Sequence, residues 1–324
     1  MPAFLVTGGA GFIGSHLVEE LLRRGHIVRV ADNLSTGKHA NVDAAVASAR
    51  GDRSEALPAP EVVIGDLADP EVARRAVDGM DIVLHQAAIP SVPRSIDDPL
   101  ASHRANVDAT VVVLDAARHA RVRRLVFAGS SSEYGDTPTL PKREDMPVNP
   151  MSPYALQKVI GEQYLQQFTR FYGLDAVSTR YFNVFGPRQD PSSPYSGVIS
   201  LFVRALLAGR APLVHGDGEQ TRDFTYVSNV VDGVLRAAET PGIAGEVMNI
   251  ATGARVSLNQ LFETLQRLIG TRVTPQYGPA RNGDVRDSQA DITKAQRLLG
   301  YAPSVDFEEG LRRTVEWFRE RDAT

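Results

Sequence analysis

The stretch Thr7-Gly8-Gly9-Ala10-Gly11-Phe12-Ile13-Gly14 decides the fold of this chain. It follows a short apolar run at residues 4–6 and opens an amphipathic pattern that predicts a helix to about Arg24. Glycines at such a turn let a pyrophosphate approach the backbone, and the helix N-terminus offers unpaired amides. By itself the GxxGxxG spacing is a weak signal, and a turn that only needs small residues is the less favoured alternative. The predicted ligand contacts in the turn are Gly8, Gly11, Phe12, Ile13 and Gly14.

Short β-branched apolar runs alternate with helical patterns through the first half of the chain. This rhythm predicts an α/β fold of the Rossmann type, a doubly wound parallel sheet with helices on both faces. The predicted strands lie at residues 4–6, 27–31, 62–64, 82–85, 125–128 and 176–180. Residues 35–60 lack the pattern, and we interpret them as a surface insertion.

After Arg180 the composition changes to Asn, Gly, Pro and aromatic residues, which predicts a smaller α/β C-terminal substrate lobe. Segment 223–251 reads as a return to the large domain. The expected helices of the second half lie at residues 198–208, 258–269 and 307–320. The predicted division is 1–180 with the return segment 223–251 for the Rossmann domain, and 181–222 with 252–324 for the interleaved smaller domain.

The composition excludes several classes of function. With 35 basic and 39 acidic residues the net charge is −4, so no general field attracts nucleic acid or anionic lipid. The absence of cysteine excludes disulfides, thiolate metal sites and cysteine nucleophiles, and no metal site is expected. The N-terminus has no secretory leader pattern, and no run of about 18 apolar residues occurs. We therefore expect a cytoplasmic protein with no nucleic-acid or membrane partner.

Asp32 ends the second predicted strand, eighteen residues beyond Gly14. A carboxylate there can accept hydrogen bonds from a ribose 2′-hydroxyl and would repel a 2′-phosphate, which favours NAD over NADP. A turn cap formed with Asn33 and Ser35 is the alternative, and Arg29 is close in sequence. Asn33 is included among the predicted cofactor contacts.

Two more strands end in candidate cofactor contacts, because ligands collect at the carboxyl ends of strands in open α/β sheets. These contacts are Asp66 and Leu67 after the third strand and Gln86, Ala87 and Ala88 after the fourth. Ordinary loop chemistry is an equal alternative for each. We interpret His85 as a hydrogen-bonded strand-end histidine rather than a catalyst.

Tyr154 and Lys158 are four residues apart on a helix introduced by Ser152-Pro153, and so share one helix face. A free tyrosine has a pKa of about 10, and a neighbouring ammonium favours its phenolate as a general base. The serine run 130–132 follows the fifth strand and can share the substrate proton. An incidental pair on a solvated helix is the alternative, although the chain has only four lysines.

These motifs together resemble the extended short-chain dehydrogenase/reductase family, and within it the UDP-sugar 4-epimerases. The resemblance is carried by TGGAGFIGSH, DNLSTG, GDL, HQAA, SSSEYG, YALQK, RYFNVFGPRQ, RDFTYV and RNGDVRDSQAD. It implies that Tyr154 is the base, Lys158 its electrostatic partner and Ser130 the assisting hydroxyl, with Ser131 as a possible substitute. It also implies an NAD cofactor, with Tyr181 among its contacts.

For the reaction, the resemblance implies that Tyr154 removes the C4 hydroxyl proton of a UDP-sugar while hydride passes to NAD. The resulting 4-keto sugar turns and takes the hydride back on its other face. The implied substrate contacts are Asn183, Arg222, Arg281, Asp284 and Ser288 together with Ser130 and Tyr154. Surface ion pairing is the alternative for each arginine.

Ser288 takes the place where relatives limited to non-acetylated hexoses carry tyrosine. We therefore hypothesise that UDP-GlcNAc and UDP-GalNAc are used as well as UDP-glucose and UDP-galactose. Dehydratases of the group carry an Asp-Glu pair where this chain has Ser131 and Ser132, so elimination lacks its acid. Glu133 and Arg94 leave a UDP-glucuronate 4-epimerase or decarboxylase open. A non-catalytic NAD-binding regulator is the alternative from another class.

We expect a homodimer, because relatives of the resembled family pair through a four-helix bundle. The helices concerned would lie near residues 105–118 and 153–172. Apolar residues of these segments are consistent with pairing but could equally be core: Val111, Val112, Leu114, Ile160, Tyr164 and Phe168.

Overall fold

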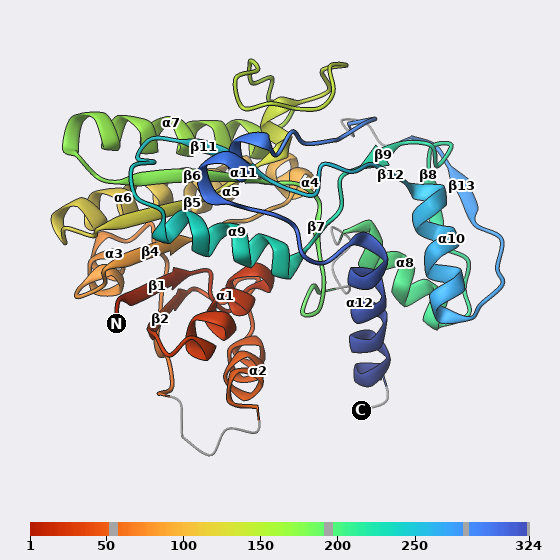
Figure 1. The fold of residues 1–324 in the computed structure, drawn as a ribbon, viewed down its shortest axis with the longest axis horizontal. Helices are drawn as coiled ribbons and strands as arrows, with labels where there is room; N and C mark the ends of the chain where they lie inside the picture. Colours follow the sequence, from red (N-terminus) through yellow and green to blue (C-terminus); the bar gives the residue numbers. More distant parts are fainter. Residues whose placement is uncertain (52–57, 191–196, 281–284, 323–324) are drawn as a thin grey trace.

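A seven-stranded parallel sheet forms the centre of the molecule in the computed structural model, which describes residues 1–51, 58–190, 197–280 and 285–322 (Figure 1). The strand order is β11-β6-β5-β4-β1-β2-β3, so the winding direction reverses between β1 and β4. The strands are β1 (Ala3–Thr7), β2 (Ile27–Asp32), β3 (Glu61–Ile64), β4 (Ile82–His85), β5 (Arg124–Ser130), β6 (Ala176–Tyr181) and β11 (Val247–Ile250). The predicted doubly wound Rossmann fold is confirmed.

Helices cover both faces of this sheet, which is why its inner strands β1, β4, β5 and β6 are buried along nearly their whole length. One face packs against α1 (Phe12–Arg23), α2 (His39–Arg50), α9 (Val227–Glu239) and α11 (Thr293–Leu299). The other face packs against α3 (Pro70–Val77), α6 (Ala109–His119) and α7 (Pro153–Tyr172). Within the described ranges, no helix has the length and hydropathy needed to cross a membrane.

The expectation of an unpatterned insertion at residues 35–60 is wrong for its first half, where α2 forms. Val42, Ala45 and Ala49 recur at helical spacing and are buried against α1. Three small apolar residues are a weak pattern in a sequence, but they allow two helices to approach closely. Residues 52–57 lie outside the described chain.

Several short elements lie between β4 and α7. They are α4 (Val92–Asp97), α5 (Pro99–His103), the π-helical turn η1 (Arg104–Asp108) that leads into α6, and the 3-10 turn η2 (Ser131–Tyr134) after β5. α7 begins at Pro153 because Ser152 accepts a hydrogen bond from Ala155 N–H at its N-cap.

A second hydrophobic core lies beside the carboxyl edge of the sheet, toward the C-terminus (Figure 1). Its helices are α8 (Val198–Leu207), α10 (Leu258–Ile269) and α12 (Phe307–Asp322), close to the predicted positions. Three two-stranded pairs accompany them: β7 (Val184–Phe185) with β10 (Thr225–Tyr226), β9 (Thr221–Arg222) with β12 (Val256–Ser257), and β8 (Leu213–His215) with β13 (Gln276–Gly278). The chain returns to the large sheet through α9, which packs on it, and β11, which pairs with β6.

Candidate active site

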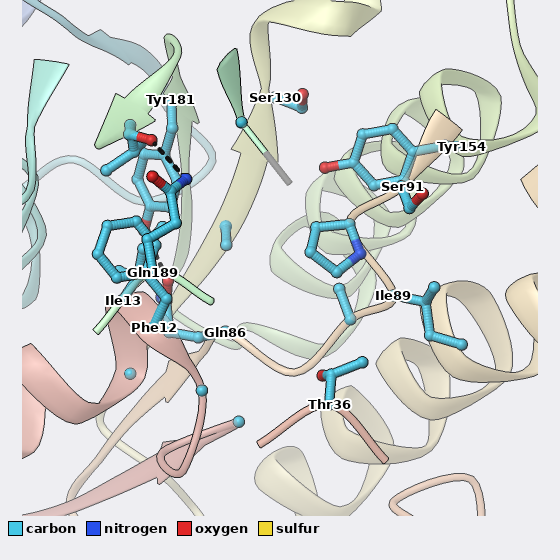
Figure 2. A pocket seen from close by; sticks show the side chains of 18 of the residues that line it. Phe12, Ile13, Thr36, Gln86, Ile89, Ser91, Ser130, Tyr154, Tyr181 and Gln189 are labelled. Atoms are coloured by element: carbon cyan, nitrogen blue, oxygen red, sulfur yellow. Dashed lines mark hydrogen bonds between the residues drawn. The ribbon is translucent and has the colours of Figure 1, made fainter. Parts of the chain in front are cut away.

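A cavity of about 960 Å³ runs along the carboxyl edge of the sheet, at the point where the strand order reverses. Ligands bind at this position in open α/β sheets. Figure 2 shows side chains from both sides of it, with Phe12 and Gln86 near one wall and Tyr154 on the other. Its wall includes every predicted cofactor contact: Gly8, Gly11, Phe12, Ile13, Gly14, Asp32, Asn33, Asp66, Leu67, Gln86, Ala87, Ala88, Tyr154, Lys158 and Tyr181.

The glycine turn is built so closely that side chains cannot enter it. Gly8 has a φ of +66°, and a Cβ there would lie 2.8 Å from the Ala87 backbone nitrogen. A Cβ on Gly14 would overlap the carbonyl oxygen of Gly8. Gly11 is the N-cap of α1, and no side chain caps it, so the first amides of α1 are available to an anion. The turn therefore fits the pyrophosphate of a dinucleotide.

Asp32 is held at the end of β2 by the loops that follow it. Its carboxylate accepts hydrogen bonds from Ala10 N–H at 3.0 Å and Leu34 N–H at 2.8 Å, and it lines the cavity. The turn-capping role and an acceptor role toward a ribose are thus compatible. Arg29 points elsewhere, because its Nε donates to Glu61 at 2.7 Å and its Nη1 to the Asp78 carbonyl at 2.6 Å. The arginine that could have favoured a 2′-phosphate is engaged away from Asp32.

Thr7 organises the edge of the cavity and was missed by sequence reasoning. Its Oγ1 accepts the N–H groups of Gln86 at 3.1 Å and Ala87 at 3.2 Å. The same Oγ1 lies 2.8 Å from His85 Nδ1, and His85 Nε2 lies 3.1 Å from Thr110 Oγ1. Burial lowers the pKa of His85 to about 3, so the ring is neutral. The prediction that His85 is a hydrogen-bonded residue at a strand end is confirmed. The sequence signal that could have revealed Thr7 is a polar residue at the end of an apolar strand.

Tyr154 and Lys158 lie one turn apart on α7 and both line the cavity. Lys158 Nζ donates to the Ala128 carbonyl at 2.8 Å and lies 6.0 Å from the centre of the Tyr154 ring. Ser130, at the end of β5, lines the same cavity, and its hydroxyl lowers the pKa of the Tyr154 phenol. The start of the helix is fixed by Ser95 Oγ, which accepts Tyr154 N–H at 3.0 Å. The three predicted catalytic residues are therefore brought together.

The electrostatics of this group differ from the sequence-based expectation. Burial raises the pKa of Tyr154 to about 12, while the hydrogen bond with Ser130 lowers it and Glu133 raises it further. Burial also lowers the pKa of Lys158 to about 8, which Glu133 opposes. In the protein without a ligand, the desolvation of Tyr154 and Lys158 therefore has a larger effect on their pKa values than any attraction between the phenolate and the ammonium. A positive charge on a bound ligand would favour the phenolate.

Ser130, Ser131 and Ser132 all line the cavity. Ser130 Oγ accepts hydrogen bonds from Ser132 N–H at 3.2 Å and Ser132 Oγ at 2.8 Å. Ser131 also lines the cavity, but the serine whose hydroxyl affects the pKa of Tyr154 is Ser130. Glu133 is fully buried and lies outside the cavity wall, so it cannot contact a bound sugar.

The wall nearest the second core carries three of the predicted substrate contacts. Asn183, Arg222 and Ser288 all line the cavity. Arg222 Nη1 donates to the Thr221 and Arg286 carbonyls, each at 2.9 Å, which joins β9 to the segment before Ser288. Two further predicted contacts, Arg281 and Asp284, lie outside the described residues.

A second cavity of about 900 Å³ continues from this wall and shares Asn183, Arg204 and Arg222 with the first. α8, β8 and Leu258 line its remainder. Arg204 was not predicted, although an arginine within the otherwise apolar helix VISLFVRALL was a visible hint. The two cavities together offer room for a dinucleotide and a second nucleotide-bearing ligand.

A doubly wound sheet with a glycine-built dinucleotide turn and a Ser-Tyr-Lys cluster on one cavity wall defines a dinucleotide-dependent enzyme of the extended short-chain dehydrogenase/reductase class. The chain belongs to the NAD dependent epimerase/dehydratase family, whose sequence profile matches residues 4–251. The predicted NAD cofactor agrees with this family and with the fit of the glycine turn and Asp32.

Similar proteins cover the whole chain. A UDP-glucose 4-epimerase of Mycolicibacterium smegmatis is 42% identical over 98% of both chains. The crystal structure of a UDP-glucose 4-epimerase from Thermotoga maritima with UDP-glucose is 38% identical, with a TM-score of 0.91 over 98% of this chain and 99% of that one. A UDP-N-acetylglucosamine 4-epimerase from Methanobrevibacter ruminantium, in complex with UDP-N-acetylmuramic acid, is 38% identical, with a TM-score of 0.91 over 99% of each chain. The chain is therefore an enzyme of the epimerase type.

Proposed function

We propose that this chain is an NAD-dependent UDP-sugar 4-epimerase that interconverts UDP-glucose with UDP-galactose and UDP-GlcNAc with UDP-GalNAc. The observation that carries the proposal is the placement of Ser130, Tyr154 and Lys158 on the wall of one cavity, which is continuous with a second cavity of nucleotide size. Similarity to enzymes named for UDP-glucose and UDP-N-acetylglucosamine supports both substrate pairs.

In the proposed reaction, Tyr154 Oη takes the proton of the sugar C4 hydroxyl and later returns it. Ser130 Oγ, on the same cavity wall, binds the C4 oxygen and keeps it in line. The Lys158 ammonium favours the phenolate, because it is held on Ala128 O close to the ring. NAD, when bound, supplies the oxidising and reducing equivalents and a positive ring. The glycine turn and Asp32 hold it.

We assign the remaining contacts by their position on the wall. Asn183 and Arg222 would hold the substrate diphosphate, since arginine binds it bidentately and stays charged. Arg281 and Asp284 keep the substrate roles expected from their motif. We also propose that residues 1–180 with 223–251 hold the cofactor, while 181–222 and 252–324 form the substrate domain.

The size of Ser288 supports acceptance of acetylated sugars. Its small side chain lies on the cavity wall, where a tyrosine would fill the space. A UDP-glucuronate substrate is the second candidate, because Arg94 also lines the cavity and could meet a carboxylate. Glu133 no longer contributes to that candidate, since it points away from the cavity.

Purified protein should be incubated separately with UDP-galactose, UDP-GlcNAc and UDP-glucuronate, and the products separated by chromatography. We expect 4-epimers of the first two sugars, with Tyr154→Phe reducing kcat by about 10²- to 10⁴-fold. Failure to convert any 4-epimer pair, or full activity of Tyr154→Phe, would contradict the proposal. Conversion of UDP-glucuronate alone would instead establish the second candidate.

We further propose a homodimer of cytoplasmic protein, paired through α7. Leu156, Tyr164 and Phe171 are exposed on its outer face at helical spacing. Of the residues expected to pair, Leu114 and Phe168 instead belong to the core. Light scattering should give twice the chain mass, and Tyr164→Glu with Phe171→Glu should give the monomer. A monomeric wild type would refute the pairing.

A further inference from the structure

A buried carboxylate lies directly behind the catalytic wall. Glu133 is in the turn η2, between the serine run and Tyr134, and its side chain has no exposed surface. It does not line the cavity, and no step of the proposed reaction uses it. Burying an ionised carboxylate costs free energy unless it is paired and hydrogen-bonded, so the contacts of Glu133 need to be described.

Glu133 grips the catalytic serine through the backbone. Its Oε1 accepts Ser130 N–H at 2.8 Å, which completes a capping box around the turn. Its Oε2 lies 3.1 Å from Arg180 Nε, on β6. Arg180 is already paired with Glu162 of α7 through both Nε and Nη2. Two buried carboxylates therefore share one guanidinium, which leaves an uncompensated negative charge when both are ionised.

Lys158 is a further cation whose charge acts on Glu133. Its ammonium bonds to Ala128 O while Glu133 bonds to Ser130 N–H, so the two groups flank Gly129 at the end of β5. A Cβ on Gly129 would come within 3.2 Å of Glu133 Oε1, which shows how closely the carboxylate lies against this backbone. Charges in such a water-poor region interact strongly.

The ionisation of the cluster agrees with this geometry. Burial and Glu162 raise the pKa of Glu133 to about 8, while Arg180, the Ser130 hydrogen bond and Lys158 lower it. The Glu133 charge in turn raises the pKa of Lys158 and of Tyr154. At alkaline pH, where Glu133 ionises, its charge therefore opposes loss of the proton from Lys158.

We propose that Glu133 is a positioning residue for the reaction: it holds Ser130 in place on the cavity wall beside Tyr154, and in its ionised form, at alkaline pH, it supplies a buried negative charge that keeps Lys158 an ammonium. It acts through these residues and touches no substrate. The inference rests on the proposed function for the reaction that Ser130 serves.

Three variants separate the two parts of this role. Glu133→Gln keeps an oxygen for Ser130 N–H and loses the charge, whereas Glu133→Leu loses both. Glu162→Gln makes the same neutralising change on the other carboxylate of Arg180 without touching Ser130. Each should be assayed for kcat and KM across pH 6 to 10 on a UDP-sugar that the wild type converts.

We expect Glu133→Leu to lower kcat by more than about tenfold with little change in KM, because Ser130 N–H is left without a partner. Glu133→Gln should recover most of this loss. On the alkaline side of its pH profile, however, kcat should decline at a pH about one unit lower than in the wild type. Glu162→Gln should not move that decline to lower pH, since removing the repulsion favours ionised Glu133. Wild-type kcat in the Leu variant, or a Gln variant as impaired as Leu, would overturn the role of the hydrogen bond.

A titration that needs no turnover tests the charge. The chain has four lysines, so ¹⁵N-lysine NMR gives few signals, and Lys158→Met assigns the one of interest. Lys158 should lose its proton at lower pH in Glu133→Gln than in the wild type; equal titration would overturn the counter-ion role. If the wild type converted no UDP-sugar, the proposed function would fail while this titration still decided the inference. Should Glu133→Leu not fold, the Gln variant alone decides through both measurements.

Discussion

The two ends of the cavity are built by different physics. At the cofactor end, Gly8, Gly11 and Gly14 leave the backbone bare, and the ligand site consists of amides and space. At the catalytic end, Ser130, Tyr154 and Lys158 are ionisable or polar side chains supported by buried charges. Substitutions at the cofactor end should therefore act mainly through steric clashes. Substitutions at the catalytic end should act mainly through changes in electrostatic interactions.

The largest effect is expected where a methyl group has nowhere to go. Gly14→Ala places a Cβ on the Gly8 carbonyl oxygen, a backbone atom that cannot move aside. We expect it to destabilise the fold by about 3 kcal/mol or more, measured by chemical denaturation. Gly11→Ala is the matched control, because its Cβ would be 3.1 Å from the same oxygen and its φ is −79°. Equal stability of the two variants would contradict the steric explanation of the cofactor end.

Replacing Lys158 with Met should stabilise the fold and at the same time slow the reaction. The pKa of Lys158 falls from 10.5 to about 8 on folding, so the folded state binds its proton less tightly, and below pH 8 this residue opposes folding. The variant should therefore unfold at a higher temperature at pH 7, while kcat falls by about 10²-fold or more. Lys294→Met, at an ion pair with Glu246, should change neither property much. A less stable Lys158→Met protein would contradict the electrostatic account.

Sequence patterns predicted which residues line the cofactor end of the cavity because the determinants of that end are local. The glycine turn and Asp32 follow consecutive strands, and the sheet topology then brings Asp66 and Gln86 to the same edge. The contacts of Glu133, Arg180 and Glu162 join η2, β6 and α7, so no spacing in the sequence reveals them. The raised pKa of Tyr154 was missed for the same reason, since burial depends on the packed structure. α2 was missed because its small apolar residues gain meaning only against α1.

Asp32→Asn should sharpen the cofactor half at smaller cost. The amide oxygen can still accept from Leu34 N–H, but the charged acceptor proposed for the ribose is lost. Hydrogen bonds to charged groups contribute about 1.5–3 kcal/mol, so NAD affinity should fall at least tenfold by calorimetry. Arg29→Ala is the control and should leave the preference for NAD over NADP unchanged, because Arg29 pairs with Glu61. A change in that preference would return Arg29 to the site.

His85 gives the smallest and most graded prediction, because it lies between the two ends and serves neither chemically. Its pKa falls from 6.5 to about 3 on folding, so the unfolded chain binds the extra proton between these values. Its contribution to stability should be complete above pH 6.5 and decline by about 1.4 kcal/mol per pH unit as the pH falls toward 3. Glu133, with a raised pKa, acts in the opposite direction between about pH 4.5 and 8. Denaturation of His85→Asn across pH 4 to 7 should therefore show a flatter acid decline than the wild type, with kcat at pH 7 within about threefold. A large loss of kcat in a folded variant would place His85 in the reaction, and an unchanged acid decline would mean that other groups control it.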